Sequence, residues 1–250
     1  MRVAVVTIFP EMVRAFAATG LIRRAVEEGR LEVVETDLRG FTTDRHRTVD
    51  DVPFGGGGGM VMKPEPLFVA VEATRREGDR VILMSPQGTV LTDAVVRRLA
   101  ASPGLVVICG RYEGVDERVR EGLVDEEVSI GDYVLSGGEL PALVLVEAVS
   151  RYVPGVVGNA RSVEQDSFAA GLLDHPHYTR PAEFRGRKVP DVLVSGNHGE
   201  VEKWRRREAL RQTLLKRPDL LERATLSPPD RAIIEGLRKA RKAGEGNQEG

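Results

Sequence analysis

The sequence of 250 residues contains a single cysteine, Cys109, and therefore has no internal disulfide framework. Disulfide frameworks belong to oxidising compartments, so this composition fits a reducing, cytoplasmic one. Cys109 ends an apolar strand pattern, and no neighbouring histidine or electropositive helix start is evident that would activate it. We therefore interpret Cys109 as a buried residue and not as a nucleophile.

Long hydrophobic runs are also missing. The apolar stretch at the amino terminus ends at Pro10, and the run from Leu143 to Val149 is interrupted by Glu147. A membrane helix needs about 20 predominantly apolar residues in succession, so we expect no membrane segment. Hydrophobic residues make up 41% of the chain and charged residues 30%, proportions that are typical of soluble globular proteins.

The common nucleotide-binding motifs are absent as well. Neither G-x-G-x-x-G nor G-x-x-x-x-G-K-[ST] occurs, which disfavours a Rossmann dinucleotide site and a P-loop. The formal net charge is only -2, so any contact with nucleic acid has to come from a local basic patch.

The sequence does contain an alternation of apolar strand patterns and amphipathic helices, which predicts an α/β domain. The expected strands are 3–8, 31–38, 80–84, 105–109 and 126–130. Four helices are expected over 21–28, 66–77, 92–100 and 115–121. Two more are expected to begin at Pro10 and at Pro141. Between Arg39 and Met60 there is no periodicity, and this stretch ends in five consecutive glycines, 55–59. These glycines are either loose slack or a surface against which a large ligand lies.

Three of the expected strands end in loops of turn-forming residues, namely Ser85–Gly88, Cys109–Gly114 and Ser129–Pro141. Each loop taken alone is more often an ordinary connection between a strand and a helix. In open α/β sheets, however, ligands bind outside the carboxyl ends of the strands, where all three loops are expected to lie. Their main-chain groups suit a purine edge, and Tyr133, Leu135 and Leu140 offer apolar contacts to its ring. The three loops together predict a site for an adenosine-like molecule.

Beyond residue 154 the composition changes. Residues 155–170 are rich in glycine and polar side chains and are predicted to be a flexible linker. Residues 171–243 carry two strongly charged helical patterns, Val201 to Lys216 and Asp230 to Lys242, and are predicted to form a small α-helical second domain. Residues 244–250 are predicted to be a disordered tail, and residues 1–154 are assigned to the α/β domain.

A basic stretch lies in this second part of the chain. Between Arg185 and Arg217 there are 10 lysines and arginines against 4 acidic residues, an excess of 10 - 4 = +6. The centre of the stretch is Lys203-Trp204-Arg205-Arg206-Arg207. Such a helix either follows phosphates and offers Trp204 as a stacking face, or is a solvated charged helix with a core tryptophan.

Four motifs occur in an order that matches a known family. They are Cys109–Gly114, Ser129–Pro141, Asp166–Phe168 and Asp174–Pro181. Through them the chain, from Val3 to about Leu226, resembles the bacterial tRNA (guanine-N1)-methyltransferases, the TrmD-type members of the SPOUT class. The resemblance implies a parallel α/β sheet whose carboxyl-terminal part forms a trefoil knot, and S-adenosylmethionine as methyl donor. It also implies tRNA as substrate and a homodimer whose active site combines both subunits.

The resemblance also implies roles for individual residues. Those expected in the donor pocket are Pro86, Gly110, Tyr112, Glu113, Gly114, Ser129, Ile130, Gly131, Asp132, Tyr133, Val134, Leu135, Gly137, Gly138 and Pro141. Asp166 would be the general base that removes the N1 proton of the guanosine immediately 3′ of the anticodon, and Arg151 would stabilise charge on O6. Without the resemblance, Asp166 is an exposed linker carboxylate and Arg151 a cation at a helix end.

The remaining candidates concern the RNA and metals. Residues expected to contact the substrate are Asp174, Lys203, Arg205, Arg206 and Arg207. No metal site is predicted, because His175, His177, His198 and Asp174 lack the closed four-ligand pattern with cysteines that structural zinc needs. The resemblance implies magnesium-dependent activity, for which the sequence shows no ligand cage. Two other functions stay open: another SPOUT methyltransferase acting on a ribose 2′-OH or on rRNA, and a non-catalytic RNA-binding module.

Overall fold

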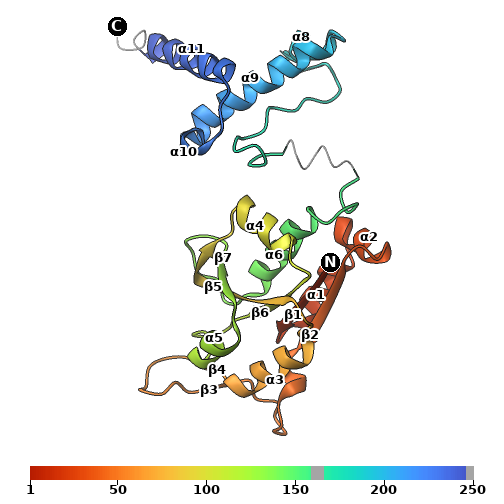
Figure 1. Cartoon of the computed structure of the whole chain (residues 1–250), viewed down its shortest axis with the longest axis vertical. Coiled ribbons are helices and arrows are strands. Elements are labelled where there is room, and N and C mark those ends of the chain that lie inside the picture. The colour runs from red at the N-terminus through yellow and green to blue at the C-terminus, as the bar shows by residue number, and fades with distance from the viewer. Residues whose placement is uncertain (159–165, 246–250) are drawn as a thin grey trace. The chain divides into compact units, whose positions relative to one another are not determined.

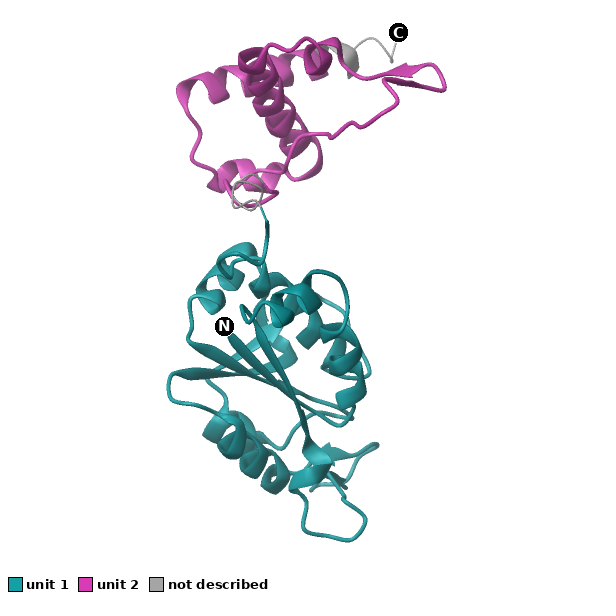
Figure 2. Cartoon of the chain, turned by 90° about the vertical axis from the view of Figure 1, so that its right-hand side faces the viewer, with its two compact units in different colours: residues 1–160 teal, residues 161–250 magenta. Residues whose placement is uncertain are grey.

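The computed structural model describes residues 1–158 and 166–245. The chain divides into two compact units, unit 1 with residues 1–160 and unit 2 with residues 161–250 (Figure 2). The division falls inside the segment 155–170 that was predicted to be a linker, of which 159–165 lie outside the described residues. None of the helices in the described part of the chain has both the length and the apolar character needed to cross a membrane.

Unit 1 is built on a parallel sheet of five strands in the order β2-β1-β6-β5-β7, which confirms the predicted α/β class (Figure 1). The strands are β1 (Arg2–Thr7), β2 (Glu32–Asp37), β5 (Asp79–Val90), β6 (Gly104–Cys109) and β7 (Glu126–Ser129). All five strand patterns in the sequence are therefore confirmed. Strand β6 is buried along its whole length, as expected of a strand covered on both faces.

Helices cover both faces of the sheet. One face carries α1 (Pro10–Ala17), α2 (Gly20–Glu27), α4 (Asp93–Ala100) and α6 (Glu139–Ser150), and the other carries α3 (Pro64–Thr74), α5 (Glu117–Leu123) and the 3-10 helix η1 (Leu38–Phe41). Alternate residues of β1 enter the two cores, with Val3 and Val5 on one side and Ala4 and Val6 on the other. This alternation is the period of two that places successive side chains on opposite faces.

The five glycines connect two short antiparallel strands, β3 (Asp50–Asp51) and β4 (Val61–Met62). The end of the run is anchored, because the amide of Glu113 donates to the carbonyl of Met60 and the amide of Met62 to the carbonyl of Gly114, both at 2.9 Å. Gly59 has φ +83, and a Cβ there would overlap the Glu113 side chain. At its carboxyl end the glycine run is therefore fitted against the loop that follows β6, which is not the behaviour of loose slack.

One connection differs from the sequence-based expectation. The segment Ser85–Gly88, predicted to be a turn at the end of a strand, lies inside β5, which continues to Val90. Met84 and Thr89 both pair with Val128, so the four residues between them form a bulge and the ladder then resumes. The prediction was wrong because β-forming residues after the turn sequence restore pairing with β7, and a periodicity argument cannot detect that register shift.

Unit 2 is mainly helical. Its elements are the hairpin β8 (Glu183–Phe184) and β9 (Arg187–Lys188), followed by α8 (Asp191–Val194), α9 (His198–Lys216), α10 (Pro218–Arg223) and α11 (Pro228–Glu245). Its small core consists of Leu172, Leu210, Leu214, Leu221 and Ile234. Helix α11 continues two residues into the segment 244–250 that was predicted to be disordered. The rest of that predicted tail, 246–250, lies outside the described residues.

Candidate functional site

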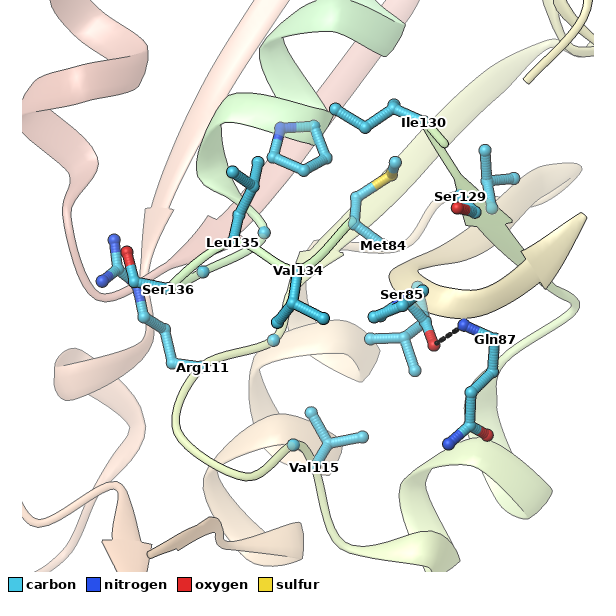
Figure 3. Close-up of a pocket in the computed structure, with 18 of the residues that line it drawn as sticks. Met84, Ser85, Gln87, Arg111, Val115, Ser129, Ile130, Val134, Leu135 and Ser136 are labelled. Carbon is cyan, nitrogen blue, oxygen red and sulfur yellow. Dashed lines mark hydrogen bonds between the residues drawn. The ribbon is translucent and has the colours of Figure 1, made fainter. Parts of the chain in front are cut away.

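A cavity of about 280 Å³ lies where β5, β6 and β7 end or bulge, at the edge of the sheet that the sequence singled out. Its wall is formed by the β5 bulge, the loop after β6 and the loop between β7 and α6. In Figure 3 the side chains of Met84, Val134 and Leu135 lie between Arg111 on one side and Gln87 on the other. Its volume is close to the lower end of ligand pockets, about 300 to 1,000 Å³.

Two glycine-rich loops form this wall by packing backbone against backbone. The amide of Gly138 donates to the carbonyl of Gly110 at 2.8 Å. A Cβ on Gly138 would lie 2.8 Å from the Cα of Cys109 and 2.9 Å from the amide nitrogen of Gly110. Only glycine fits this crossing, and the loops can therefore approach a ligand with main-chain groups.

A buried carboxylate fastens the two loops to the end of β1. Glu139, the first residue of α6, is only 1% exposed. Its carboxylate accepts a hydrogen bond from the Thr7 hydroxyl at 2.8 Å and another from Nε of Arg111 at 2.9 Å. Its position at a helix amino terminus adds a favourable interaction with the helix dipole. Sequence reasoning missed this network; the available signal was a glutamate at the start of an otherwise apolar helix.

Cys109 lies beneath the same loops and is buried. Burial, and secondarily the charge of Glu139, raises the pKa of its thiol well above the ordinary value. A thiol with a raised pKa is a poor nucleophile near neutral pH. The interpretation of Cys109 as a buried residue is therefore confirmed.

The cationic side chains in the cavity wall are already paired. Arg111 is bound to Glu139, and its guanidinium lies over the Phe9 ring at 4.5 Å. Arg120 donates to the Gln87 amide oxygen at 2.9 Å and to the Glu127 carboxylate at 2.5 Å. Glu113, an exposed carboxylate, also lines the cavity. The wall therefore suits a neutral heterocycle attached to a cationic group better than it suits an anion.

The structure brings most of the predicted donor-pocket residues together. Of the fifteen, fourteen line the cavity, and Asp132 does not. Lining residues that sequence reasoning missed are Leu83, Met84, Ser85, Gln87, Arg111, Val115, Arg120, Val128 and Ser136. Most of them are neighbours in sequence of residues that were predicted to line the pocket, so the loops that hold those residues already indicated this part of the wall. Arg120 comes from the middle of α5, which no loop motif marks.

A second cavity, of about 210 Å³, lies within unit 2. It is lined by Asp166, Ala170, Leu172, Leu173, Asp174, His175, Glu202, Arg205, Arg206 and Ala209. It brings together four residues that the sequence proposed for the substrate side, Asp166, Asp174, Arg205 and Arg206. Three of the predicted residues lie outside this wall. The Lys203 ammonium is exposed and donates to Glu200 at 2.8 Å. Arg207 lies on α9 but does not line the cavity. Arg151 belongs to unit 1, as the C-cap of α6.

Asp174 holds two histidines of the same motif. Its carboxylate lies 2.5 Å from Nδ1 of His175 and 2.8 Å from Nε2 of His177. Burial pushes the pKa of Asp174 up, but the hydrogen bonds from the two histidines outweigh it and lower the pKa below the ordinary value. The His175 and Tyr178 rings each lie 6.3 Å from the Trp204 ring. Trp204 is partly buried and packs against this motif.

Arg206, proposed as an RNA contact, has a structural role. Its guanidinium binds the carboxylate of Asp230 in α11 through two hydrogen bonds, of 2.9 and 2.8 Å. Asp230 is 5% exposed and also accepts from the Ser227 hydroxyl. The Arg206 guanidinium lowers the pKa of Asp230, so this pair is charged throughout the neutral range.

We expect Arg206→Ala to destabilise unit 2 by about 3 kcal/mol, because it leaves a buried carboxylate without its partner. Urea unfolding monitored by the fluorescence of Trp204, the single tryptophan, measures this. The matched control is Arg205→Ala, whose exposed bond to Glu202 contributes less than about 1 kcal/mol.

The same pair predicts a pH dependence. Because the folded-state pKa of Asp230 is lowered, its contribution is complete above the ordinary pKa of 3.8 and is lost as the pH falls below it. The Arg206→Ala variant should show a weaker loss of unit 2 stability in acid than the wild type. Equal stability of the Arg206 and Arg205 variants at neutral pH would contradict the assignment.

A second expected result concerns the loop crossing. Gly138→Ala should raise the dissociation constant of a ligand in the unit 1 cavity by about 5- to 150-fold, since overpacking costs about 1–3 kcal/mol. Calorimetric titration with S-adenosylmethionine, the ligand that the family resemblance implies, measures this dissociation constant. Gly40→Ala is the control, because a Cβ at Gly40 has nothing within 4 Å. Equal affinities of these two variants would show that the crossing does not shape the ligand site.

The fold and this cavity define an α/β protein with a cavity at the carboxyl edge of its sheet, the place where open α/β sheets bind ligands. A family model described as tRNA (Guanine-1)-methyltransferase TrmD matches residues 1–223. A tRNA (guanine-N(1)-)-methyltransferase of Moorella thermoacetica is 54% identical over 249 residues, covering 98% of this chain and 99% of that protein. One of Methylococcus capsulatus is 57% identical over 242 residues, covering 96% of each. The chain therefore belongs to the TrmD family of tRNA (guanine-1)-methyltransferases, and the resemblance inferred from its motifs is confirmed.

Proposed function

We propose that this protein transfers the methyl group of S-adenosylmethionine to N1 of the guanosine immediately 3′ of the anticodon in tRNA. The observation that carries the proposal is the unit 1 cavity, in which fourteen residues chosen through the family motifs converge. Membership of the TrmD family supports the same activity.

The cavity fits this donor on two grounds. The absence of a Cβ at Gly138 lets its loop pack directly on the backbone of Cys109 and Gly110, so that the cavity wall is formed largely by main-chain groups that can bond a purine edge. The paired arginines and the Glu113 carboxylate avoid repulsion of a sulfonium. Residues of this wall would hold the adenosine, while the bound sulfonium supplies an electrophilic methyl group.

Asp166 is proposed as the general base. Guanine N1 carries a proton and has no in-plane lone pair, so that proton must leave before N1 can attack a methyl group. The Asp166 carboxylate accepts the proton, and the N1 electron pair forms the bond to the methyl carbon while the C–S pair returns to sulfur. Asp166 is partly buried and lines a cavity together with the apolar Leu172 and Ala209.

Arg151 is proposed to stabilise the charge that develops on the purine O6. Its guanidinium is permanently charged and presents a fixed fork of donors. Such a cation lowers the barrier when it is placed where negative charge appears only in the transition state. Asp174 is proposed to bind the substrate; it lines the same cavity of unit 2 as Asp166.

A homodimer is proposed as the working form, with the active site combining two copies. Apolar side chains beside the donor cavity are exposed, including Val134 in the loop and Leu140 and Val144 on α6. Exposed apolar patches mark association surfaces, and these exposed side chains support the proposal of a dimer. We propose in addition that the chain forms a trefoil knot at the crossing of Gly110 and Gly138.

No ligand set is proposed for magnesium. In residues 1–158 and 166–245, Asp174, His175 and His177 form a group whose ligand atoms lie within 4.8 Å of one another. Their mutual hydrogen bonds already satisfy the carboxylate, and magnesium prefers oxygen ligands to imidazole.

The direct test is incubation of the protein with labelled S-adenosylmethionine and unmodified tRNA that has a guanosine 3′ of the anticodon. Nucleoside analysis and mapping are expected to find N1-methylguanosine at that position. A 2′-O-methyl nucleoside, or methylation of rRNA instead, would support the alternative SPOUT activity. Donor binding without turnover would support a non-catalytic RNA-binding module.

A further inference from the structure

The hairpin of β8 and β9 projects from the body of unit 2 (Figure 2). Glu183 pairs with Lys188 and Phe184 with Arg187, and the amide of Val189 closes the base by donating to the carbonyl of Ala182 at 2.9 Å. All four strand residues are exposed. The hairpin therefore contributes little to the core and presents its side chains outward.

The side chains of the hairpin combine positive charge with one aromatic ring. Residues 183–188 contain three arginines and lysines and one carboxylate, an excess of 3 - 1 = +2 in a chain of net charge -2. Phe184 is 62% exposed, and the Arg185 guanidinium lies over its ring at 5.3 Å. An exposed phenyl ring beside cations is the combination with which proteins bind single-stranded nucleic acid.

The backbone conformation at the tip of the hairpin also indicates a function for its side chains. Arg185 has φ 50 and Gly186 φ 75, so both central residues of this turn are left-handed. Asparagine and glycine are favoured at the first of these positions, whereas a long side chain there carries a conformational cost. Arg185 is exposed, and the Phe184 ring that its guanidinium covers is exposed as well, so the core does not require it. A strained residue that the core does not require is a reason to look for a function of its side chain.

We propose that this hairpin is an RNA-binding element of the protein: Arg185, Arg187 and Lys188 contact phosphates, and Phe184 stacks on an unpaired nucleobase. The proposal rests on the proposed function, which makes tRNA the substrate. The hairpin favours RNA over a protein partner, because three of its six residues are cations, which suit phosphates, whereas charged residues are depleted at the centre of protein interfaces. A cationic tip with one aromatic ring instead suits a nucleic acid strand, in which each cation can contact one phosphate and the ring can stack on one base.

The charge contribution is tested with the double variant Arg187→Ala/Lys188→Ala. Its tRNA dissociation constant should rise, and the slope of log affinity against log salt should become shallower by roughly one to two, as expected for two lost phosphate contacts. The matched control is Arg238→Ala/Lys239→Ala, two exposed cations on α11 of the same unit. Affinity for S-adenosylmethionine should stay unchanged in both double variants.

The stacking contribution is tested with Phe184→Leu and Phe184→Tyr. Leucine keeps an apolar side chain but loses the ring, so tRNA binding should weaken about 5- to 100-fold, whereas tyrosine should retain it. Arg185→Asn keeps the turn and removes the cation. It should leave the Trp204 unfolding transition unchanged or more stable and still weaken tRNA binding.

Separate measurements of tRNA binding and of methyl transfer distinguish failure of the hairpin proposal from failure of the proposed function. Wild-type tRNA affinity and salt slope in the hairpin variants, or a loss equal to that of the α11 control, would overturn the hairpin proposal while methylation by the wild type still stands. If the wild-type protein binds tRNA but transfers no methyl group, the proposed function fails, and the tRNA dissociation constants of the same variants still decide the role of the hairpin.

Discussion

Asp166→Asn is expected to lower the single-turnover rate of methyl transfer to tRNA by about 100- to 10,000-fold, the usual contribution of a general base. Asparagine keeps the size of the side chain and its place in the unit 2 cavity but cannot accept the N1 proton. Rapid-quench measurement with saturating donor and tRNA isolates the chemical step. Binding of S-adenosylmethionine and of tRNA should change by less than about threefold, since neither needs proton transfer.

The matched control is Asp191→Asn, an exposed carboxylate at the start of α8 in the same unit. Its single-turnover rate should equal that of the wild type. A wild-type rate for Asp166→Asn would contradict the assignment of the base. A loss that appears only in tRNA affinity would make Asp166 a binding residue.

Glu139→Ala is expected to lower the free energy of unfolding of unit 1 by about 3 to 5 kcal/mol, the cost of breaking a buried ion pair by removing one partner. The substitution leaves the Arg111 guanidinium and the Thr7 hydroxyl without the carboxylate that they share. Urea unfolding followed by circular dichroism measures the change, and the fluorescence of Trp204 reports unit 2 separately. The Trp204 transition should keep its midpoint.

Two further variants bracket this result. Glu139→Gln keeps the hydrogen-bonding shape without the charge, so its loss should be smaller than that of alanine. Glu27→Ala removes an exposed partner of Arg23 in α2 and should cost less than about 1 kcal/mol. Equal losses for Glu139→Ala and Glu27→Ala would show that the buried pair does not fasten the loops.

The sequence predicted the strands of unit 1 and the edge of the sheet at which the cavity lies, because local signals suffice for both. Apolar runs marked the buried strands, and glycines at their ends marked loops that need tight turns. The β5 bulge escaped prediction because it depends on register with β7, which is set by pairing between distant residues. Asp132, which the family resemblance placed in the donor pocket, does not line the cavity, whereas its neighbours Gly131 and Tyr133 do, and the motif alone cannot show which residues of the loop face inward.

Long-range polar pairs were beyond the reach of the sequence. Thr7 and Glu139 are 132 residues apart, and Arg206 and Asp230 are 24 apart on different helices. Nothing in the local composition indicates which arginine of a basic run faces a buried carboxylate and which faces solvent. The basic run on α9 therefore looked uniform, whereas the structure gives Arg206 and Lys203 different surroundings.

The most direct test of the donor site is amide NMR on protein labelled with [15N]glycine, titrated with S-adenosylmethionine. We predict saturable shifts of the Gly110, Gly137 and Gly138 resonances, which line the cavity, while Gly20 and Gly199 stay in place. Saturable binding that leaves the three cavity glycines unmoved would contradict the account, because the donor would then occupy another part of the molecule.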